Sequence, residues 1–320
     1  MEKPNPAAVG ETCSAIRSRR HTLALMLGAG GWLPGALAAA DSGPPVRLVI
    51  SDSLVTDVNL NDARAAMQIW VRRMAQDLKV VVEFNPKVFD TTEEVLRRAR
   101  SGQFDCVALN VVEYRQIADV LDDSQIIVEG GAPGLEQYVL LAKRESGIQH
   151  LGELRGRRLC TLKAPKMCVA SAWLSTILDE GRFGSSDQFF GVVTTDTKAS
   201  RVVLPVFFGQ IDACLTTKRS LDTMGELNPQ VAKDLTVIAS SPAMLVTFYI
   251  FRKNYRGLSR ESFAKVYSDL PATAAGRQIA TLFQFESLVV KDIACLAPAL
   301  AVLDSADRAR GRRGAAGRKG

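Results

Sequence analysis

Histidine is the scarcest residue in the chain, and its scarcity removes several classes of enzyme. Of the two histidines, His21 lies in the first forty residues and His150 stands alone in the remainder. The sequence has no cluster of His, Cys and carboxylates at zinc-ligand spacing. It also lacks a Gly-rich phosphate loop ending in Lys-Ser/Thr and a Gly-x-Ser-x-Gly elbow. We therefore expect no catalytic residue, no metal and no cofactor, and the protein is predicted not to be an enzyme.

Long apolar runs are missing after residue 40, so we expect no stable membrane insertion of that part, because a bilayer span needs about 20 apolar residues. The one apolar run, residues 22–40, follows a basic stretch and ends in Ala-x-Ala patterns suited to cleavage. A buried first helix is the alternative, but its glycines and Pro34 would weaken it. Residues 1–40 are therefore predicted to be a signal peptide. Ser18-Arg19-Arg20 resembles a twin-arginine signal, and export would place the protein in the periplasm.

The basic charge of the chain is confined to its two ends. Residues 1–40 carry four basic and two acidic residues, and residues 304–320 carry six and two, so the formal charge of +6 leaves residues 41–303 neutral. The overall pI is therefore no argument for nucleic-acid binding, and we expect no nucleic-acid partner. Residues 304–320 are almost free of apolar residues and are predicted to be a basic disordered tail, with a nucleic-acid arm as the alternative.

Cysteine gives little information about the fold. Five cysteines follow residue 40, an odd number that leaves at least one unpaired in a monomer. Cys106 and Cys214 fall in apolar runs and are predicted to be small buried hydrophobes. Cys160 and Cys168 are close enough in sequence to pair in an oxidising compartment, but the sequence leaves open whether they do.

Strand-like and helix-like segments alternate between the two ends, which indicates an α/β fold with mostly parallel sheet. Short β-branched runs at 46–51, 79–84 and 104–109 are separated by helical patterns at 63–78 and 91–101. This order is typical of a doubly wound half. The same order of strand, helix and strand returns at 189–195, 198–209 and 211–217.

Two similar phrases lie at corresponding places in these two halves. GQFDCVAL runs from Gly102 to Leu109, and GQIDACL runs from Gly209 to Leu215. In each phrase the glycine is predicted to end a helix and the aspartate to begin a strand. Because ligands bind at the carboxyl ends of such strands, Asp105 and Asp212 are predicted to be structural and the loops after the strands functional.

Residues 60–78 and 89–114 resemble the first lobe of the phosphonate/phosphite/phosphate-binding proteins of ABC transporters, in which a Gly-x-hydrophobic-Asp strand leads to a Tyr-containing loop. Residues 151–160 resemble the opening of that family's second lobe, and 207–254 resemble its passage through the second lobe and back. The resemblance spans most of 46–290. It implies a type II periplasmic solute-binding protein, in which two doubly wound α/β lobes are joined by two crossing strands. Lobe 1 would hold 45–135 plus 245–303, and lobe 2 would hold 136–244.

The resemblance also implies a function. The protein would capture a small, anionic, phosphonate-like ligand in a cleft that closes like a hinge, and would deliver it to the permease of an ABC importer. The alternative is a periplasmic ligand-sensing module whose partner is a membrane sensor kinase or cyclase. Both functions use the same lobes and the same cleft.

The candidate ligand residues follow from the loops after the strands, where hydroxyls and free N–H groups at helix N-termini favour an anion. In the turn where the family is rich in Ser and Thr, this chain has Lys163 and Lys166. At the position of the family's His-Asp pair, this chain has Thr194–Thr197. Ordinary turn chemistry is the alternative for each polar residue, and a core position is the alternative for the tyrosine. The candidates are Ser51, Asp52, Ser53, Asn110, Tyr114, Lys163, Lys166, Thr195, Asp196, Thr197 and Thr216.

Overall fold

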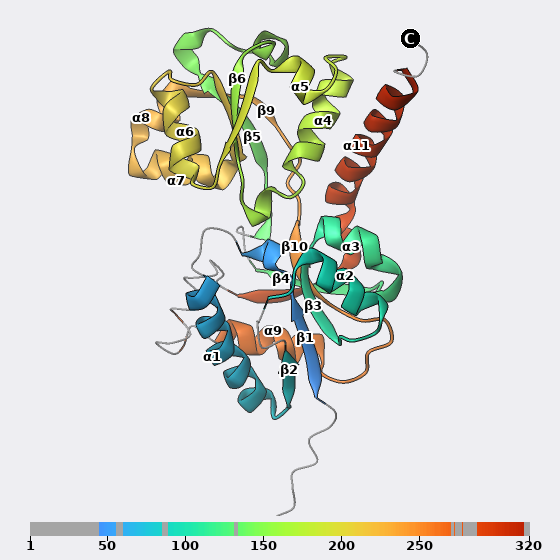
Figure 1. The fold of residues 1–320 in the computed structure, drawn as a ribbon. Coiled ribbons are helices and arrows are strands. Elements are labelled where there is room, and N and C mark those ends of the chain that lie inside the picture. The colour runs from blue at the N-terminus through green and yellow to red at the C-terminus, as the bar shows by residue number, and fades with distance from the viewer. Residues whose placement is uncertain are drawn as a thin grey trace, which may run out of the picture. The chain divides into compact units, whose positions relative to one another are not determined.

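The computed structural model describes residues 45–55, 60–84, 89–130, 134–269, 272, 277 and 287–316. The predicted signal peptide, residues 1–40, lies outside these residues. Two mixed sheets with helices on their faces make up the described part (Figure 1). None of the described helices combines the length and the apolar character that a membrane span requires.

The first sheet has the strand order β11-β4-β10-β3-β1-β2. Its strands are β1 (Val46–Ile50), β2 (Val82–Phe84), β3 (Cys106–Asn110), β4 (Gln125–Glu129), β10 (Thr247–Phe251) and β11 (Leu288–Asp292). Strands β1, β2 and β3 are parallel, whereas β10 runs antiparallel to β3 and β4. The helices of this lobe are α1 (Leu60–Leu78), α2 (Thr92–Arg100), α3 (Val111–Ile117) and α9 (Arg260–Asp269).

The second sheet has the order β7-β6-β8-β5-β9. Its strands are β5 (Tyr138–Lys143), β6 (Arg158–Leu162), β7 (Val192–Asp196), β8 (Ala213–Thr217) and β9 (Leu235–Ser240). Here β5 is the antiparallel strand, between β8 and β9. The helices are α4 (Ala170–Glu180), α5 (Ser186–Phe189), α6 (Ala199–Phe207), α7 (Lys218–Leu227) and α8 (Pro229–Asp234).

The two sheets share one plan, because β2-β1-β3-β10-β4 and β7-β6-β8-β5-β9 match strand for strand. In each, the antiparallel strand comes from the chain as it passes between the lobes: β5 enters the second sheet, and β10 returns to the first. The doubly wound α/β lobes and the two crossing strands are thus as the sequence predicts.

The repeated phrases also occupy matching places. Gly102 follows α2 with φ of 69°, and Gly209 follows α6 with φ of 71°, a left-handed conformation that favours glycine after a helix. Asp105 and Asp212 come next, directly before β3 and β8. The phrase therefore encodes a helix end and the start of the third strand in each lobe.

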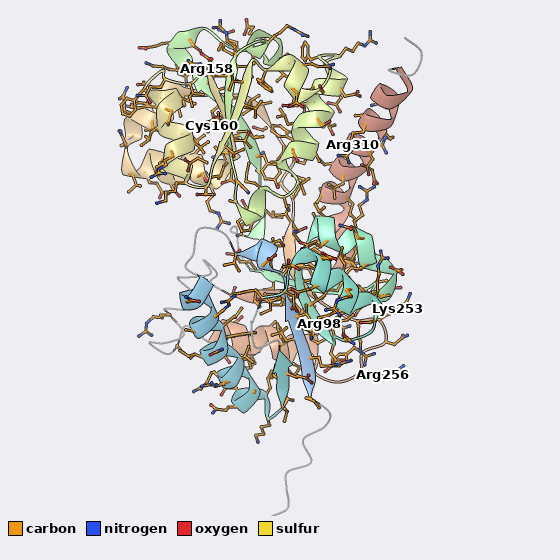
Figure 2. The ribbon with its side chains drawn as sticks, viewed as in Figure 1. Arg98, Arg158, Cys160, Lys253, Arg256 and Arg310 are labelled. Atoms are coloured by element: carbon orange, nitrogen blue, oxygen red, sulfur yellow. The ribbon has the colours of Figure 1, made fainter. Side chains whose placement is uncertain are left out.

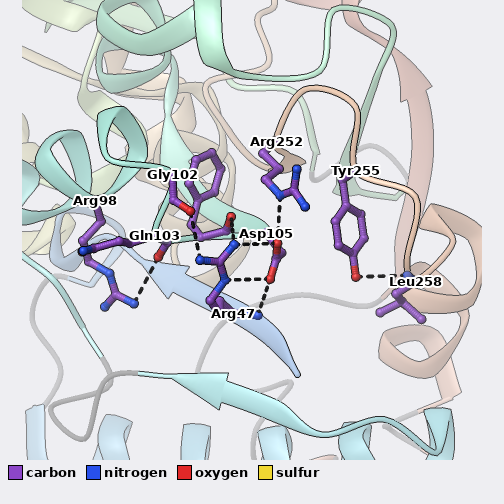
Figure 3. A network of polar contacts seen from close by, with 9 residues as sticks. Arg47, Arg98, Gly102, Gln103, Asp105, Arg252, Tyr255 and Leu258 are labelled. Carbon is purple, nitrogen blue, oxygen red and sulfur yellow. Dashed lines mark hydrogen bonds and ion pairs between the residues drawn. The ribbon is translucent and has the colours of Figure 1, made fainter. Parts of the chain in front are cut away.

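Each aspartate links its strand to the start of the neighbouring parallel strand, Asp105 to β1 (Figure 3) and Asp212 to β6. Asp105 Oδ2 accepts hydrogen bonds from the backbone N–H and the Nε of Arg47, at 2.9 and 3.0 Å. Asp212 Oδ2 accepts the same two bonds from Arg158, at 2.9 and 3.0 Å. The prediction that both aspartates are structural is confirmed by these bonds.

The core of the first lobe is built on the inward face of an amphipathic helix. Residues Ala63, Met67 and Trp70 of α1 are buried at helical spacing. Trp70 lies edge-on to Phe263 of α9, with 6.2 Å between ring centroids. The opposite face of the sheet packs under α2 and α3, whose buried side chains include Val95 and Ile117.

The C-terminal segment corrects one prediction. Residues 304–320 are predicted to be disordered, but α11 is a helix over Ala297–Ala316. Its buried side chains, Ala299, Val302, Leu303, Ala306 and Ala309, recur every three or four residues and so form one face. Alanine and arginine are strong helix formers, and Arg115 of α3 pairs with Asp304 and Asp307. In the sequence, the many arginines of this segment make its narrow apolar face, built mostly of alanines, hard to recognise.

The five cysteines that the structure describes are free thiols. Cys160 lies on β6 (Figure 2) in register with Cys214 of β8 rather than beside Cys168. The Cys160–Cys168 disulfide that the sequence left open is absent from the structure. Cys106 and Cys214 are buried in strands, as predicted, and burial raises the pKa of both thiols.

Candidate functional site

The predicted site residues lie at or shortly after the carboxyl ends of parallel strands. In the first lobe, β1 and β3 end at Ile50 and Asn110, and in the second, β6, β7 and β8 end at Leu162, Asp196 and Thr217. Open α/β sheets bind ligands at these edges. The 3-10 turns η1 (Asp52–Leu54) and η6 (Pro165–Met167), one from each lobe, contact each other. Both carboxyl edges therefore contribute to one region.

In the first lobe the candidate residues converge on Glu113, a residue that is absent from the predicted set. Glu113 Oε1 accepts the hydroxyls of Ser51 and Thr92, both at 2.6 Å. Its Oε2 accepts the Ser53 hydroxyl at 3.1 Å and the Asn110 backbone N–H at 3.0 Å. The side chain is 2% exposed, so four donors surround a buried carboxylate.

Asn110 organises the same network by capping α3. Its Oδ1 accepts the backbone N–H groups of Val112 and Glu113, at 2.8 and 3.0 Å, and its Nδ2 donates to Ser53 Oγ at 2.9 Å. Asn110 and Glu113 thus form a reciprocal capping box. The structure brings Ser51, Ser53 and Asn110 together, as the sequence analysis expects, and their polar side-chain atoms bond to the protein itself.

Asp52 lies beside this network in a partly buried position. Its backbone N–H donates to the Asp90 carbonyl at 2.8 Å. Burial, together with the nearby carboxylates of Glu113 and Glu94, raises the pKa of Asp52. The first-lobe wall of the candidate site is therefore electronegative.

Tyr114 is placed apart from the other candidates. Its ring is partly buried and packs edge-on against Phe248 of β10, with 5.5 Å between centroids, at the margin of the hydrophobic core. Burial raises the pKa of the Tyr114 phenol, and Asp123 adds to the effect. The packing of this ring is close to the core position that was the alternative for Tyr114.

In the second lobe two predicted segments are joined by the backbone. The Lys163 N–H donates to the Asp196 carbonyl at 2.9 Å, which sets the loop after β6 beside the end of β7. The side chains of Lys163 and Thr195 are exposed. Asp196 Oδ1 accepts the Lys198 N–H at 2.8 Å, and Thr197 is partly buried. An exposed ammonium and neighbouring threonines thus occupy this edge.

Thr216 is the next-to-last residue of β8, and its hydroxyl is in an unusual state. Its side chain is fully buried, and among the described residues its Oγ1 has no hydrogen-bond partner. The next residue, Thr217, caps α7 by accepting the Ser220 N–H at 3.1 Å. A buried hydroxyl without a partner is rare in proteins, because desolvation without a hydrogen bond costs free energy.

Lys166 lies at the centre of a charged cluster that sequence analysis did not find. Its Nζ lies 2.8 Å from Glu129 Oε2 and 3.3 Å from Glu136 Oε1. Arg219 lies 3.4 Å from the same Glu136 oxygen. Burial raises the pKa of Glu136, and the two cations partly offset that rise. Lys166 is therefore a structural cation between the end of β4 and the crossing segment before β5.

A cavity adjoins this cluster at the start of α7. Its volume is about 410 Å³, and its lining includes Glu136, Gln137, Arg219 and Thr223.

Of the residues that line this cavity, only Arg219 lies within a loop that was expected to be functional from the sequence. Glu129 and Glu136 carry no local signal, because their partners are distant in sequence. Glu113 does carry a signal: it stands three residues after Asn110, the spacing of a capping box.

Comparison with known proteins identifies the family. The model of the family described as "ABC transporter, phosphonate, periplasmic substrate-binding protein" matches residues 53–293. No curated protein matches the chain. Matching solved structures include a binding protein component of an ABC phosphonate transporter from Pseudomonas aeruginosa, at 13% identity over 83% of this chain and 88% of that chain, with a TM-score of 0.53.

Two further structures show the same fold. PhnD1 from Prochlorococcus marinus, in complex with methylphosphonate, is 12% identical over 80% of this chain and 96% of that chain, with a TM-score of 0.53. A protein from Xanthomonas citri bound to ATP is 13% identical over 83% and 98%, with a TM-score of 0.57. At such identities the likeness shows the fold alone.

The family match decides between classes of function. A substrate-binding component of a transporter is not an enzyme, and the match gives no support to a sensor kinase or cyclase as partner. The matched region, residues 53–293, includes parts of both lobes and both crossing strands, β5 and β10. The chain belongs to the periplasmic, phosphonate-type substrate-binding proteins of ABC transporters.

Proposed function

We propose that this protein captures a small anionic solute of the phosphonate class and delivers it to the permease of an ABC importer. The family match supports the transport role. The observation that carries the ligand class is the second-lobe edge, where the loop after β6 brings the exposed Lys163 beside residues 195–197. A flexible ammonium and neighbouring hydroxyls suit the oxygens of a phosphonate.

The ligand would be bound mainly by Lys163, Thr195 and Thr197. The start of α7 adds a helix N-terminus capped by Thr217, and the buried Thr216 hydroxyl lies next to it. Ser51, Ser53 and Asn110 of the first lobe already bond to Glu113, so they would line the cleft and would not bind the oxyanion directly. Asp52 and Asp196 would bind a hydrogen-bond donor on the ligand rather than its oxyanion.

Export completes the proposal. Residues 1–40 would be removed as a signal peptide on the way to the periplasm. Mass spectrometry of the protein recovered from a periplasmic fraction tests this step, with a new N-terminus near residue 41 as the expected result. A cytoplasmic, full-length product would contradict it.

Thermal unfolding with a panel of solutes tests the binding function. The panel holds phosphate, phosphite, methylphosphonate, methanesulfonate and small organic cations. A ligand at 100 times its dissociation constant adds about 2.7 kcal/mol to the stability, which corresponds to roughly 2–4 °C for each kcal/mol. We expect a shift with a phosphorus oxyanion. A shift with organic cations alone would contradict the proposed ligand class.

A matched pair of variants separates the site from general charge. Lys163→Ala should reduce the shift, because it removes the exposed ammonium next to β7. Lys233→Ala is the control, since α8 precedes the amino end of β9 at the opposite edge of the same sheet. Equal shifts in both variants would show that the second-lobe edge does not bind the anion.

A further inference from the structure

Glu113 receives more hydrogen bonds than its capping role requires. A capping box needs one bond from the N-cap N–H to the glutamate, and Asn110 supplies it. The hydroxyls of Ser51, Ser53 and Thr92 donate three more. These hydroxyls come from the turn after β1 and from the first residue of α2. Residues far apart in sequence therefore converge on one carboxylate.

The chain contains a second capping box that shows the difference. At the start of α2, Glu94 Oε2 accepts the N–H of Thr91 at 2.9 Å and its hydroxyl at 3.2 Å. Thr91 is exposed and Glu94 is partly buried, and the two residues belong to one short segment of the chain. Glu113 caps α3 in the same way but lies buried among donors from elsewhere, so its surroundings are not explained by capping.

The arrangement around Glu113 is that of an oxyanion site. Three hydroxyls and one backbone N–H point at two oxygens, and all four donors are uncharged. The site lies at the carboxyl edge of β1 and β3, where open α/β sheets bind their ligands. The two oxygens that fill it belong to the protein.

We propose that Glu113 is a built-in anion that fills the oxyanion cradle of the first lobe and thereby determines specificity. The cradle consists of Ser51, Ser53, Thr92 and the Asn110 N–H. An incoming oxyanion would find these donors engaged and a like charge in place, so it is rejected from the first lobe and must be bound by the second. This inference rests on the proposed function, because it assigns the two lobes to the binding of different parts of the proposed phosphonate-type ligand.

Chemical rescue tests the proposal in the purified full chain. Glu113→Ala removes the carboxylate and leaves the four donors around a small cavity. Formate is the probe, since it supplies the missing two oxygens, and acetate and phosphate test the size limit. We expect formate at ten times its dissociation constant to raise the unfolding midpoint of Glu113→Ala by about 3 °C or more. The wild type should shift by less than about 1 °C under the same conditions.

Two controls assign the effect to the cradle. Glu94→Ala loses the capping box of α2 and should show no rescue by formate. The double variant Glu113→Ala with Ser51→Ala lacks one donor, and its rescue should need at least about tenfold more formate, as the loss of a charge-assisted hydrogen bond implies.

Every outcome of this experiment decides the proposal. A Glu113→Ala protein that folds only with formate supports it. A variant that stays unfolded in all three anions, or that folds and ignores them, overturns it. Stabilisation of the wild type by formate through Ser51 also overturns it, because the cradle would then be open. The probes do not depend on the transported solute, so a failed solute screen leaves this result intact.

Discussion

Asp105 accepts hydrogen bonds from two arginines, Arg47 of β1 and Arg252 directly after β10. Arg252 Nε lies 2.8 Å from Asp105 Oδ1, while Arg47 bonds both carboxylate oxygens (Figure 3). One aspartate thus links three neighbouring strands of the first sheet at the edge opposite the candidate site. Asp212 has only Arg158 as ion-pair partner among the described residues.

Asp105→Asn should destabilise the protein more than Asp212→Asn. The Asp105 side chain is 7% exposed and bonds to two arginines, whereas the Asp212 side chain is 23% exposed and bonds to one. Hydrogen bonds to charged groups contribute about 1.5–3 kcal/mol, so we expect a loss of about 2 kcal/mol for Asp105→Asn. Urea unfolding of both variants measures this. A larger loss for Asp212→Asn would contradict the account.

The contribution of Asp105 should disappear in acid. Burial favours its neutral form, but the bonds from Arg47 and Arg252 outweigh burial, so the pKa of Asp105 lies below its ordinary value. A lowered pKa stabilises the fold above the unfolded pKa of about 3.9, and this stabilisation is lost as pH falls through the folded pKa. The difference between wild type and Asp105→Asn should therefore be full at pH 7 and shrink below about pH 4. A difference that does not depend on pH would argue against the ion pairs.

Lys166→Met should destabilise the protein at neutral pH. It leaves Glu129 and the buried Glu136 without their ammonium, which should cost about 1–3 kcal/mol. Burial already raises the pKa of Glu136, and loss of Lys166 raises it further. A raised carboxyl pKa gives stability that is present below the unfolded pKa and lost as pH rises through the folded one. The defect should thus be largest near pH 7 and smallest near pH 4.

The double variant Lys166→Met with Glu136→Gln tests whether the uncompensated charge of Glu136 causes the defect. Removing the buried charge should recover part of the lost unfolding free energy. Lys233→Met, at the other edge of the sheet, should leave stability within about 0.5 kcal/mol of wild type. No recovery in the double variant would mean that Lys166 acts through packing and not through charge.

Helix α11 should behave as part of the fold. Leu303 is 7% exposed, and Leu303→Ala should lower the unfolding free energy by about 2–4 kcal/mol, as for other core truncations. Leu227→Ala is the control, because Leu227 is 76% exposed. Hydrogen exchange gives a second readout, with slow exchange expected for the amides of residues 301–309. Fast exchange along that stretch would contradict a folded α11 and support the disordered tail that the sequence predicts.

The thiols should resist modification in the native protein. Cys106, Cys160 and Cys214 are buried, and burial raises the pKa of Cys168 to about 12. A Cys13→Ser variant limits the assay to the cysteines that the structure describes. We expect slow reaction with a thiol reagent at pH 8 and five reactive thiols after denaturation. Fewer than five would indicate a disulfide.

The sequence was sufficient to predict the repeated part of the fold. The glycine that ends a helix and the aspartate that begins a strand are local signals, and both copies lie where the repeat places them. The C-terminal helix was missed for a local reason. Its apolar face is made mostly of alanines, and six basic residues in 304–320 outweigh them in any measure of composition.

The site was harder to predict because its chemistry is not local. Ser51 and Asn110 could be chosen from their positions at strand ends, and the capping-box spacing pairs Glu113 with Asn110. The sequence does not show that hydroxyls from the turn after β1 and from α2 bond to the same carboxylate. Lys166 is 37 residues from Glu129, so only the folded chain brings the two charges together. Tyr114 matched a family pattern in sequence, but its ring packs against the core, because the direction of a side chain on a short helix depends on tertiary packing.

Isothermal titration of the purified protein with methylphosphonate tests the central claim most directly. We expect saturable binding at one site, at least about tenfold weaker in Lys163→Ala and unchanged in Lys233→Ala, where tenfold corresponds to about 1.4 kcal/mol. Phosphite and phosphate titrations under the same conditions cover the related oxyanions. Saturable binding of an organic cation without binding of any of these anions would contradict the account, as would anion binding that Lys163→Ala leaves unchanged.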